Sequence, residues 1–124
     1  MKTLIVEDDF TSRLLLQTFL SRYGECHIAV NGKEAVQAFR AALEGGTKYD
    51  LICMDIMMPE MDGYQTMEHI RKNQTFQRLP IVALTAKAMK GDREKCLEAG
   101  ASDYLAKPVN TEQLLSALRL WLHR

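Results

Sequence analysis

The chain has 124 residues, a length that suits one domain (residues 1–124), and 47% of its side chains are hydrophobic. Its 16 basic and 16 acidic side chains balance, and no Lys/Arg-rich run is present, so nothing predicts nucleic-acid binding. No apolar stretch approaches the length of a membrane span. Met1 leads directly into a predicted strand, so no signal peptide is visible. The three cysteines lack the spacing of a disulfide framework or a metal site. We therefore expect a cytoplasmic protein that does not enter a membrane.

The first half of the chain alternates apolar runs with helical patterns. In order, it predicts a strand at Lys2–Val6, a helix at Thr11–Tyr23, a strand at Cys26–Val30, a helix from Asn31 to Gly45-Gly46 and a strand at Tyr49–Met54. In the first helix, Leu15/Phe19 and Leu16/Leu20 are each four residues apart. Asn31 followed by Glu34 predicts a capping box at the start of the second helix.

The second half continues the alternation. It predicts a helix from Asp62 to about Asn73, a strand at Pro80–Leu84, a charged helix at roughly Met89–Ala99, a strand at Asp103–Ala106 and a last helix capped by Asn110 or Thr111. Asp62 and Gln65 repeat the capping pattern, and Gly100 closes the charged helix. The inward residues predicted for the last helix are Leu114, Leu115, Leu118, Trp121 and Leu122.

This order predicts an α/β fold, because apolar strands separated by helices form a parallel sheet that is covered on both faces. In such sheets, ligands bind beyond the carboxyl ends of the strands. Polar residues follow four of the predicted strands at that point: Glu7, Asp8 and Asp9 the first, Asp55 the third, Thr85 the fourth and Lys107 the fifth. We expect them to share one edge, with Asp9 pointing away when Asp8 points inward.

Several carboxylates at one sheet edge repel one another. Two unit charges about 4 Å apart cost roughly 4 kcal/mol at an effective dielectric near 20. A divalent cation is the simplest compensation, and oxygen ligands suit Mg²⁺. The sequence therefore predicts a magnesium site at this edge.

Four motifs in this order resemble the response-regulator receiver family in its CheY-like single-domain form. They are Glu7-Asp8, Asp55 with the following Met57-Met58-Pro59-Glu60-Met61-Asp62-Gly63, Thr85-Ala86 and Lys107-Pro108. Each motif alone is common, but their conjunction at successive strand ends is specific, and the resemblance covers the whole chain. It implies a doubly wound sheet of five parallel strands in the order 2-1-3-4-5 with five helices.

The resemblance also implies a role for each site residue. Asp55 becomes the phosphoacceptor, and Lys107, the Thr85 hydroxyl and the Ala86 amide contact the phosphoryl oxygens. Mg²⁺ is implied to bind Asp8, Asp55 and the backbone carbonyl of Met57 directly, and Glu7 through water. Thr85 and Tyr104 are implied to form a switch that responds to phosphorylation.

The function implied is that of a single-domain response regulator in a two-component system. It takes a phosphoryl group from a histidine kinase or phosphotransfer protein and binds a target on the face of the fourth helix, fifth strand and fifth helix. It is not an enzyme beyond its own phosphorylation and dephosphorylation. The alternatives are a phosphorelay intermediate, a receiver excised from a hybrid histidine kinase, a metal-dependent phosphohydrolase and an unphosphorylated binding module. A hydrolase is disfavoured, because Glu7-Asp8-Asp9 lacks the Asp-x-Asp pair of haloacid dehalogenases.

Overall fold

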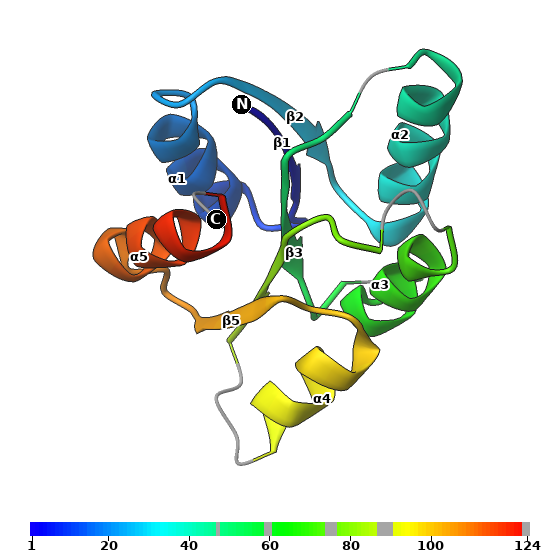
Figure 1. Cartoon of the computed structure of the whole chain (residues 1–124). Helices are drawn as coiled ribbons and strands as arrows, with labels where there is room; N and C mark the ends of the chain where they lie inside the picture. The colour runs from blue at the N-terminus through cyan, green and yellow to red at the C-terminus, as the bar shows by residue number, and fades with distance from the viewer. Residues whose placement is uncertain (47, 59–60, 74–76, 87–90, 123–124) are drawn as a thin grey trace.

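A computed structural model describes residues 1–46, 48–58, 61–73, 77–86 and 91–122. Five strands alternate with five helices, which confirms the predicted order (Figure 1). The strands are β1 (Lys2–Val6), β2 (Glu25–Ala29), β3 (Leu51–Asp55), β4 (Ile81–Thr85) and β5 (Asp103–Ala106). The helices are α1 (Phe10–Leu20), α2 (Gly32–Glu44), α3 (Gly63–Arg71), α4 (Asp92–Ala99) and α5 (Thr111–Leu122). In the described part of the chain, no helix combines the length and apolarity needed to cross a membrane.

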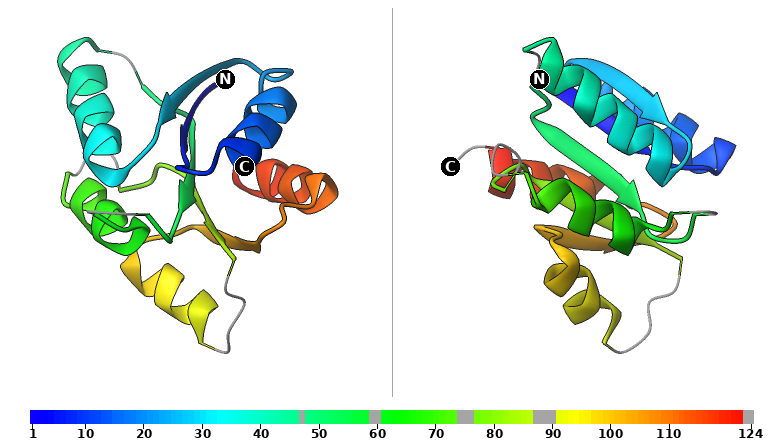
Figure 2. Two further views of the ribbon diagram at one scale, coloured as in Figure 1. Left: turned by 180° about the vertical axis from the view of Figure 1, so that it is seen from behind. Right: turned by 90° about the vertical axis from the view of Figure 1, so that its right-hand side faces the viewer.

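The strands form one parallel sheet in the order β2-β1-β3-β4-β5, as predicted. Helices α1 and α5 cover one face, and α2, α3 and α4 cover the other (Figures 1 and 2). Two apolar clusters result, because alternate residues of each strand point to opposite faces. Ile5 and Cys53 pack under α1 and α5, whereas Val6 and Met54 pack under the other helices.

Side-chain caps fix several helix starts. Asp62 and Gln65 form the predicted capping box of α3. Asn110 caps α5, since its Oδ1 accepts from the amides of Glu112 and Gln113. The capping box predicted for α2 forms only in part: Asn31 accepts from the Glu34 amide, but the Glu34 carboxylate accepts from the Val30 amide.

Several predicted boundaries were wrong by a few residues. The first helix ends at Leu20 because Ser21–Gly24 turn back: the Arg22 and Tyr23 amides donate to carbonyls three residues earlier. The third strand covers Leu51–Asp55, so Asp55 is its last residue. The third helix ends at Arg71. The predicted start of the charged helix at Met89 lies outside the described residues, and Gly91 caps α4.

Candidate functional site

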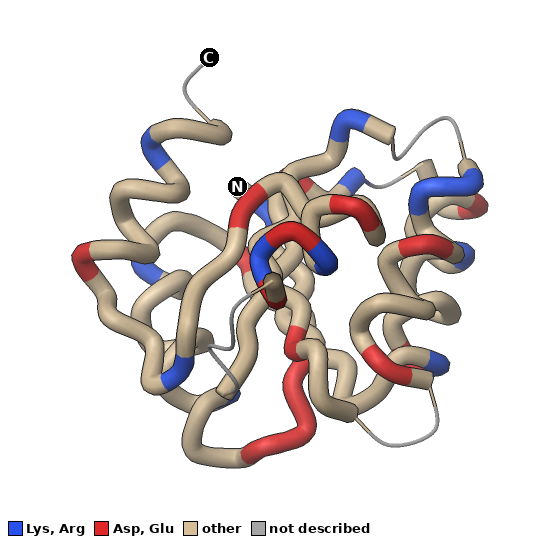
Figure 3. Tube along the Cα trace, turned by 90° about the horizontal axis from the view of Figure 1, so that it is seen from below, with Lys and Arg blue, Asp and Glu red and all other residues tan. Residues whose placement is uncertain are grey.

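Three carboxylates converge where β1 and β3 end. Glu7, Asp8 and Asp55 each offer an oxygen, and these atoms all lie within 4.8 Å of one another. Glu7 is fully buried and Asp55 is 2% exposed, whereas Asp8 faces solvent. The longest acidic stretch of the trace, Glu7–Asp9, is visible in the lower part of Figure 3. The expected cluster of acids at the sheet edge therefore forms.

Lys107 brings positive charge to this cluster from the end of β5. Its ammonium forms an ion pair with the Glu7 carboxylate and lies 3.2 Å from Asp55 Oδ1. The backbone that carries this side chain is tied to β4, because the Lys107 amide donates to the Thr85 carbonyl at 2.7 Å. The Lys107–Pro108 peptide bond is cis. A single cation thus bridges acids from two different strands.

Burial and neighbouring charges shift the pKa values of Asp55 and Lys107. Burial raises the pKa of Asp55 to about 8; Glu7 adds to the rise through a hydrogen bond and its charge, and Lys107 offsets only part of it. Burial opposes the charge on Lys107, but its contacts with Glu7 and Asp55 raise its pKa above the ordinary value. The ammonium therefore stays charged, whereas the Asp55 carboxylate needs more positive charge to ionise at neutral pH.

This donor set fits a hard divalent cation. One ammonium faces three carboxylates, so the ionised cluster lacks positive charge. All three acids offer oxygen atoms, which Mg²⁺ prefers as ligands, and Asp8 is open to solvent. The backbone carbonyl of Met57 stays a predicted ligand. The Met57 amide donates to Asp55 Oδ1 at 3.2 Å, which places this residue next to the cluster.

Close packing fixes the end of β3 on which Asp55 lies. The Ile56 amide donates to the Leu84 carbonyl at 2.9 Å, and the Ile56 carbonyl accepts from the Gly63 amide at 3.0 Å. A Cβ atom on Gly63 would lie 2.5 Å from the Asp55 carbonyl oxygen and 2.7 Å from Ile56 Cα. Only glycine can therefore begin α3 this close to the strand that carries Asp55.

The remaining predicted residues lie at or near the same strand ends. Thr85 is the last residue of β4 and is buried, Ala86 follows it and is exposed, and Tyr104 on β5 is half-buried. Ala83 lies opposite Tyr104 and Thr85 opposite Ala106, so Thr85 and Tyr104 point to the same face, two positions apart. The topology thus places the predicted switch pair near each other.

Two neighbouring residues have roles that sequence reasoning missed. Asp9 turns away from the cluster, as expected, and caps α1: its Oδ2 accepts from the Ser12 amide at 2.9 Å, and this bond lowers the pKa of Asp9. The Asp9 amide donates to Glu7 Oε2 at 3.2 Å. Arg13 donates from Nη1 to the Glu7 carbonyl at 3.3 Å. The Asp9–Ser12 spacing is a helix-start signal that could have revealed the cap.

Known proteins resemble this chain in sequence and in fold. The family model described as "Response regulator receiver domain" matches residues 3–119. Among curated relatives, "Hybrid signal transduction histidine kinase I" of Dictyostelium discoideum is 38% identical over 94% of this chain, but the match covers only 7% of that protein. "Probable transcriptional regulator ycf29" of Porphyra purpurea is 38% identical over 98% of the chain and 56% of its own length. The chain therefore spans about half or less of these relatives.

Solved structures agree with these matches. A putative response regulator from Chloroflexus aurantiacus has a TM-score of 0.89 and 33% identity, with 99% of this chain and 98% of that chain covered. The receiver domain of the sensor histidine kinase PA1611 from Pseudomonas aeruginosa, described with magnesium coordinated in its active-site cleft, has a TM-score of 0.84 and 38% identity, with the same coverage. By sequence and fold, this chain belongs to the response regulator receiver domain family.

Proposed function

We propose that residues 1–124 form one receiver domain in which Asp55 accepts a phosphoryl group from a phosphohistidine of a histidine kinase or phosphotransfer protein. The observation that carries this proposal is the convergence of Asp55, Glu7, Asp8 and Lys107 at one sheet edge. A buried cluster of this composition is costly for a small domain unless it serves a purpose. Phosphoryl transfer needs both a nucleophile and fixed positive charge, and this edge offers both.

In the proposed transfer, a carboxylate oxygen of Asp55 forms a bond to phosphorus while the bond from phosphorus to the histidine nitrogen breaks. The leaving imidazole retains the electron pair and takes a proton from solvent. Charge spreads over the three equatorial phosphoryl oxygens in the transition state. Lys107 stabilises this charge, because its ammonium already lies 3.2 Å from Asp55 Oδ1. We assign the other oxygens to the Thr85 hydroxyl and the Ala86 amide.

The same residues would hold Mg²⁺ next to the acceptor. Asp8, Asp55 and the Met57 carbonyl are the proposed direct ligands, and Glu7 is proposed to act through water. When bound, Mg²⁺ supplies positive charge that favours the ionised form of Asp55 and the phosphoryl oxygens. The exposed Asp8 leaves this side of the cluster open to solvent and to the incoming phosphodonor.

We further propose that phosphorylation changes a partner-binding face made of α4, β5 and α5. Thr85 and Tyr104 support this proposal because they lie on one face of neighbouring strands. The relatives include a hybrid kinase as well as a probable transcriptional regulator, so the proposed site is compatible with a single-domain regulator and with a relay or hybrid-kinase receiver. The single-domain role and the cytoplasmic location stay predictions. Phosphoryl transfer from Asp55 onward to an isolated phosphotransfer domain would favour the relay.

The test of the acceptor is intact-mass measurement after treatment with acetyl phosphate, with and without Mg²⁺. Wild-type protein should gain one acid-labile phosphoryl group only with Mg²⁺. Asp55→Asn should gain none, because the near-isosteric amide is not a nucleophile. Asp50→Asn, which alters an exposed carboxylate outside the site, serves as the matched control and should behave as the wild type. An undiminished adduct in Asp55→Asn would overturn the assignment.

A further inference from the structure

We propose that a groove between α2 and α3 binds an acidic, amphipathic helical segment of a partner protein. The two helices lie side by side on the face of the sheet opposite α1 and α5 (Figures 1 and 2). The groove is lined by Val36, Phe39, Arg40, Leu43, His69, Ile70, Lys72 and Asn73. It is separate from the Asp55 cluster and from the α4–β5–α5 face, so it goes beyond the function proposed above.

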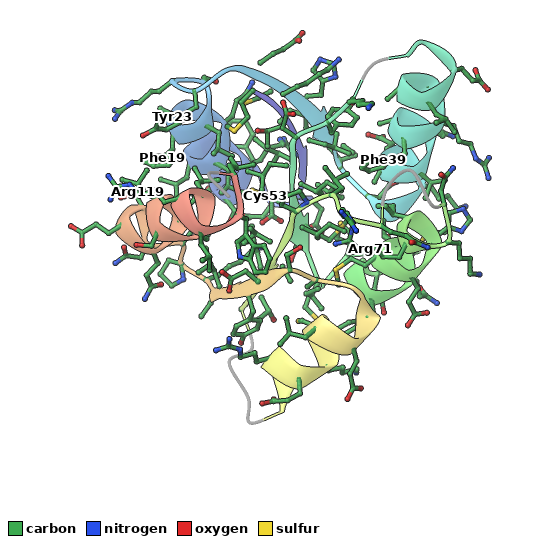
Figure 4. All side chains as sticks on the ribbon, viewed as in Figure 1. Phe19, Tyr23, Phe39, Cys53, Arg71 and Arg119 are labelled. Atoms are coloured by element: carbon green, nitrogen blue, oxygen red, sulfur yellow. The ribbon has the colours of Figure 1, made fainter. Side chains whose placement is uncertain are left out.

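The floor of the groove is apolar. Val36, Phe39 and Ile70 form its base, and their side chains also belong to or border the core beneath the two helices. Figure 4 shows Phe39 at α2, on the side that faces the sheet. Leu43 completes the floor at one end and is 46% exposed, which is unusual for a leucine next to a core. The groove has a volume of about 310 Å³, enough to receive apolar side chains of a partner.

The rim of the groove is cationic. Arg40 comes from α2, and His69 and Lys72 come from α3 and its end; all three are exposed. In the part of the chain that the structure describes, no acidic residue lines the groove, and neither Arg40 nor Lys72 forms an ion pair. This is a local excess of positive charge, because the whole chain has a net charge of zero. Charge complementarity therefore points to carboxylates on the occupant.

A helical protein segment fits this combination of floor and rim. The groove between two neighbouring helices can receive a third helix, which places its apolar residues at positions i, i+3, i+4 and i+7 in the groove. Acidic residues that flank this stripe then reach Arg40 and Lys72. The exposed ion pairs contribute little affinity individually but select the sign of the partner's charge and speed its association. Leu43, which is 46% exposed, supplies most of the apolar contact, because Val36, Phe39 and Ile70 are already buried by the packing of the two helices.

The test uses a designed helical peptide with a leucine stripe flanked by glutamates, followed by ¹H–¹⁵N NMR titration of the full chain. Shift changes should concentrate on α2 and α3, and binding should weaken as salt increases. The double variant Arg40→Glu/Lys72→Glu should lose at least tenfold in affinity. The matched control Arg22→Glu/Arg119→Glu reverses two exposed charges, one after α1 and one on α5, and should bind as the wild type.

Three outcomes would overturn the proposal. The first is equal binding of a peptide in which lysines replace the glutamates. The second is a set of shift changes that lies outside α2 and α3. The third is binding of vesicles that contain phosphatidylglycerol without binding of the peptide, which would identify a lipid surface as the occupant. Acetyl phosphate should still label Asp55 in the Arg40→Glu/Lys72→Glu variant, so loss of peptide binding is distinguishable from failure of the phosphoacceptor.

Discussion

Asp55 combines two properties that usually exclude each other, since its carboxylate is buried and must also be ionised to react. Burial raises its pKa to about 8, and the neighbouring Glu7 adds to the rise. In the described part of the chain, Lys107 is the only cation that forms ion pairs with these acids. The metal-free site therefore favours the protonated acceptor, and added positive charge converts it to the nucleophile.

The raised pKa of Asp55 predicts a stability difference that depends on pH. The folded domain, with a pKa of about 8, binds this proton more tightly than the unfolded chain does, near 3.8. The contribution to stability is thus fully present below about pH 4 and is lost as the pH rises to about 8. Each pH unit in this window is worth at most about 1.4 kcal/mol. Urea unfolding in EDTA should show wild-type stability falling toward pH 8 relative to Asp55→Asn.

Added Mg²⁺ is the control for this experiment. It should reduce the pH-dependent difference between wild type and Asp55→Asn, because a bound cation compensates the ionised carboxylates. Parallel pH profiles of the two proteins in EDTA would contradict the raised pKa of Asp55.

The three cysteines should differ sharply in reactivity. Cys53 and Cys96 are buried, and burial raises the pKa of Cys53 to about 12, so its thiolate is scarce at neutral pH. Cys53 lies in the middle of the molecule (Figure 4). Cys26, on edge strand β2, is only partly buried. Native labelling with a disulfide reagent should therefore modify Cys26 first, and Cys26→Ser should remove the fast phase. A fast phase that persists in Cys26→Ser would show that a core thiol is accessible.

At the scale of the elements, the sequence predicted their order and type better than their ends. Periodicity and capping residues located all five helices, and Asp62 with Gln65 marked a helix start correctly. The end of α1 was missed because the turn at Ser21–Gly24 depends on backbone bonds that leave little trace in the sequence. Of the two spaced pairs in α1, Leu16 and Leu20 are buried against the sheet, whereas the Leu15 side chain is 40% exposed.

Asp8 and Asp9 are adjacent but should respond oppositely to alanine substitution. Asp9 caps α1 through the Ser12 amide, so Asp9→Ala should lower the unfolding free energy of the domain. Asp8 is exposed within the acidic cluster and is not the N-cap residue of α1, so Asp8→Ala should leave metal-free stability unchanged or raise it. Calorimetric titration should show that Asp8→Ala weakens Mg²⁺ binding far more than Asp9→Ala does. Equal losses of Mg²⁺ affinity would count against the assignment of Asp8 as the ligand.

At the scale of the whole molecule, strand order and strand alternation together explain the site. Placing β1 beside β3 and β4 beside β5 brings the strand ends together, and alternation turns Glu7 and Asp55 toward the same face as Ile5 and Cys53. Both facts followed from the sequence pattern and the family resemblance. The groove between α2 and α3 could not be predicted in this way, because Arg40 and Lys72 are far apart in sequence. They become neighbours only when the two helices pack.

Phosphorylation of Asp55 should cause a conformational change that reaches the α4–β5–α5 face. We expect a phosphoryl group on Asp55 to draw the Thr85 hydroxyl toward it, which frees space for the half-buried Tyr104 ring on the same face of the sheet. Such a change biases a two-state element through one local hydrogen bond. Beryllofluoride with Mg²⁺, which mimics the phosphoryl group, should therefore shift amide NMR signals both near Asp55 and along α4, β5 and α5.

Two variants separate the local effect of beryllofluoride from the transmitted one. Thr85→Ala should keep the shifts near Asp55 and lose most of those on α4, β5 and α5, because the methyl side chain cannot form the bond that couples the two regions. Tyr104→Ala should keep the local shifts as well, while changing the remote ones, since the ring that responds is absent. Asp55→Asn controls for nonspecific binding and should show neither set. If Thr85→Ala retains the wild-type remote shifts, the hydroxyl is not the transmitter, and the signal must pass through other contacts between β4 and β5. The bond from the Lys107 amide to the Thr85 carbonyl is one such contact.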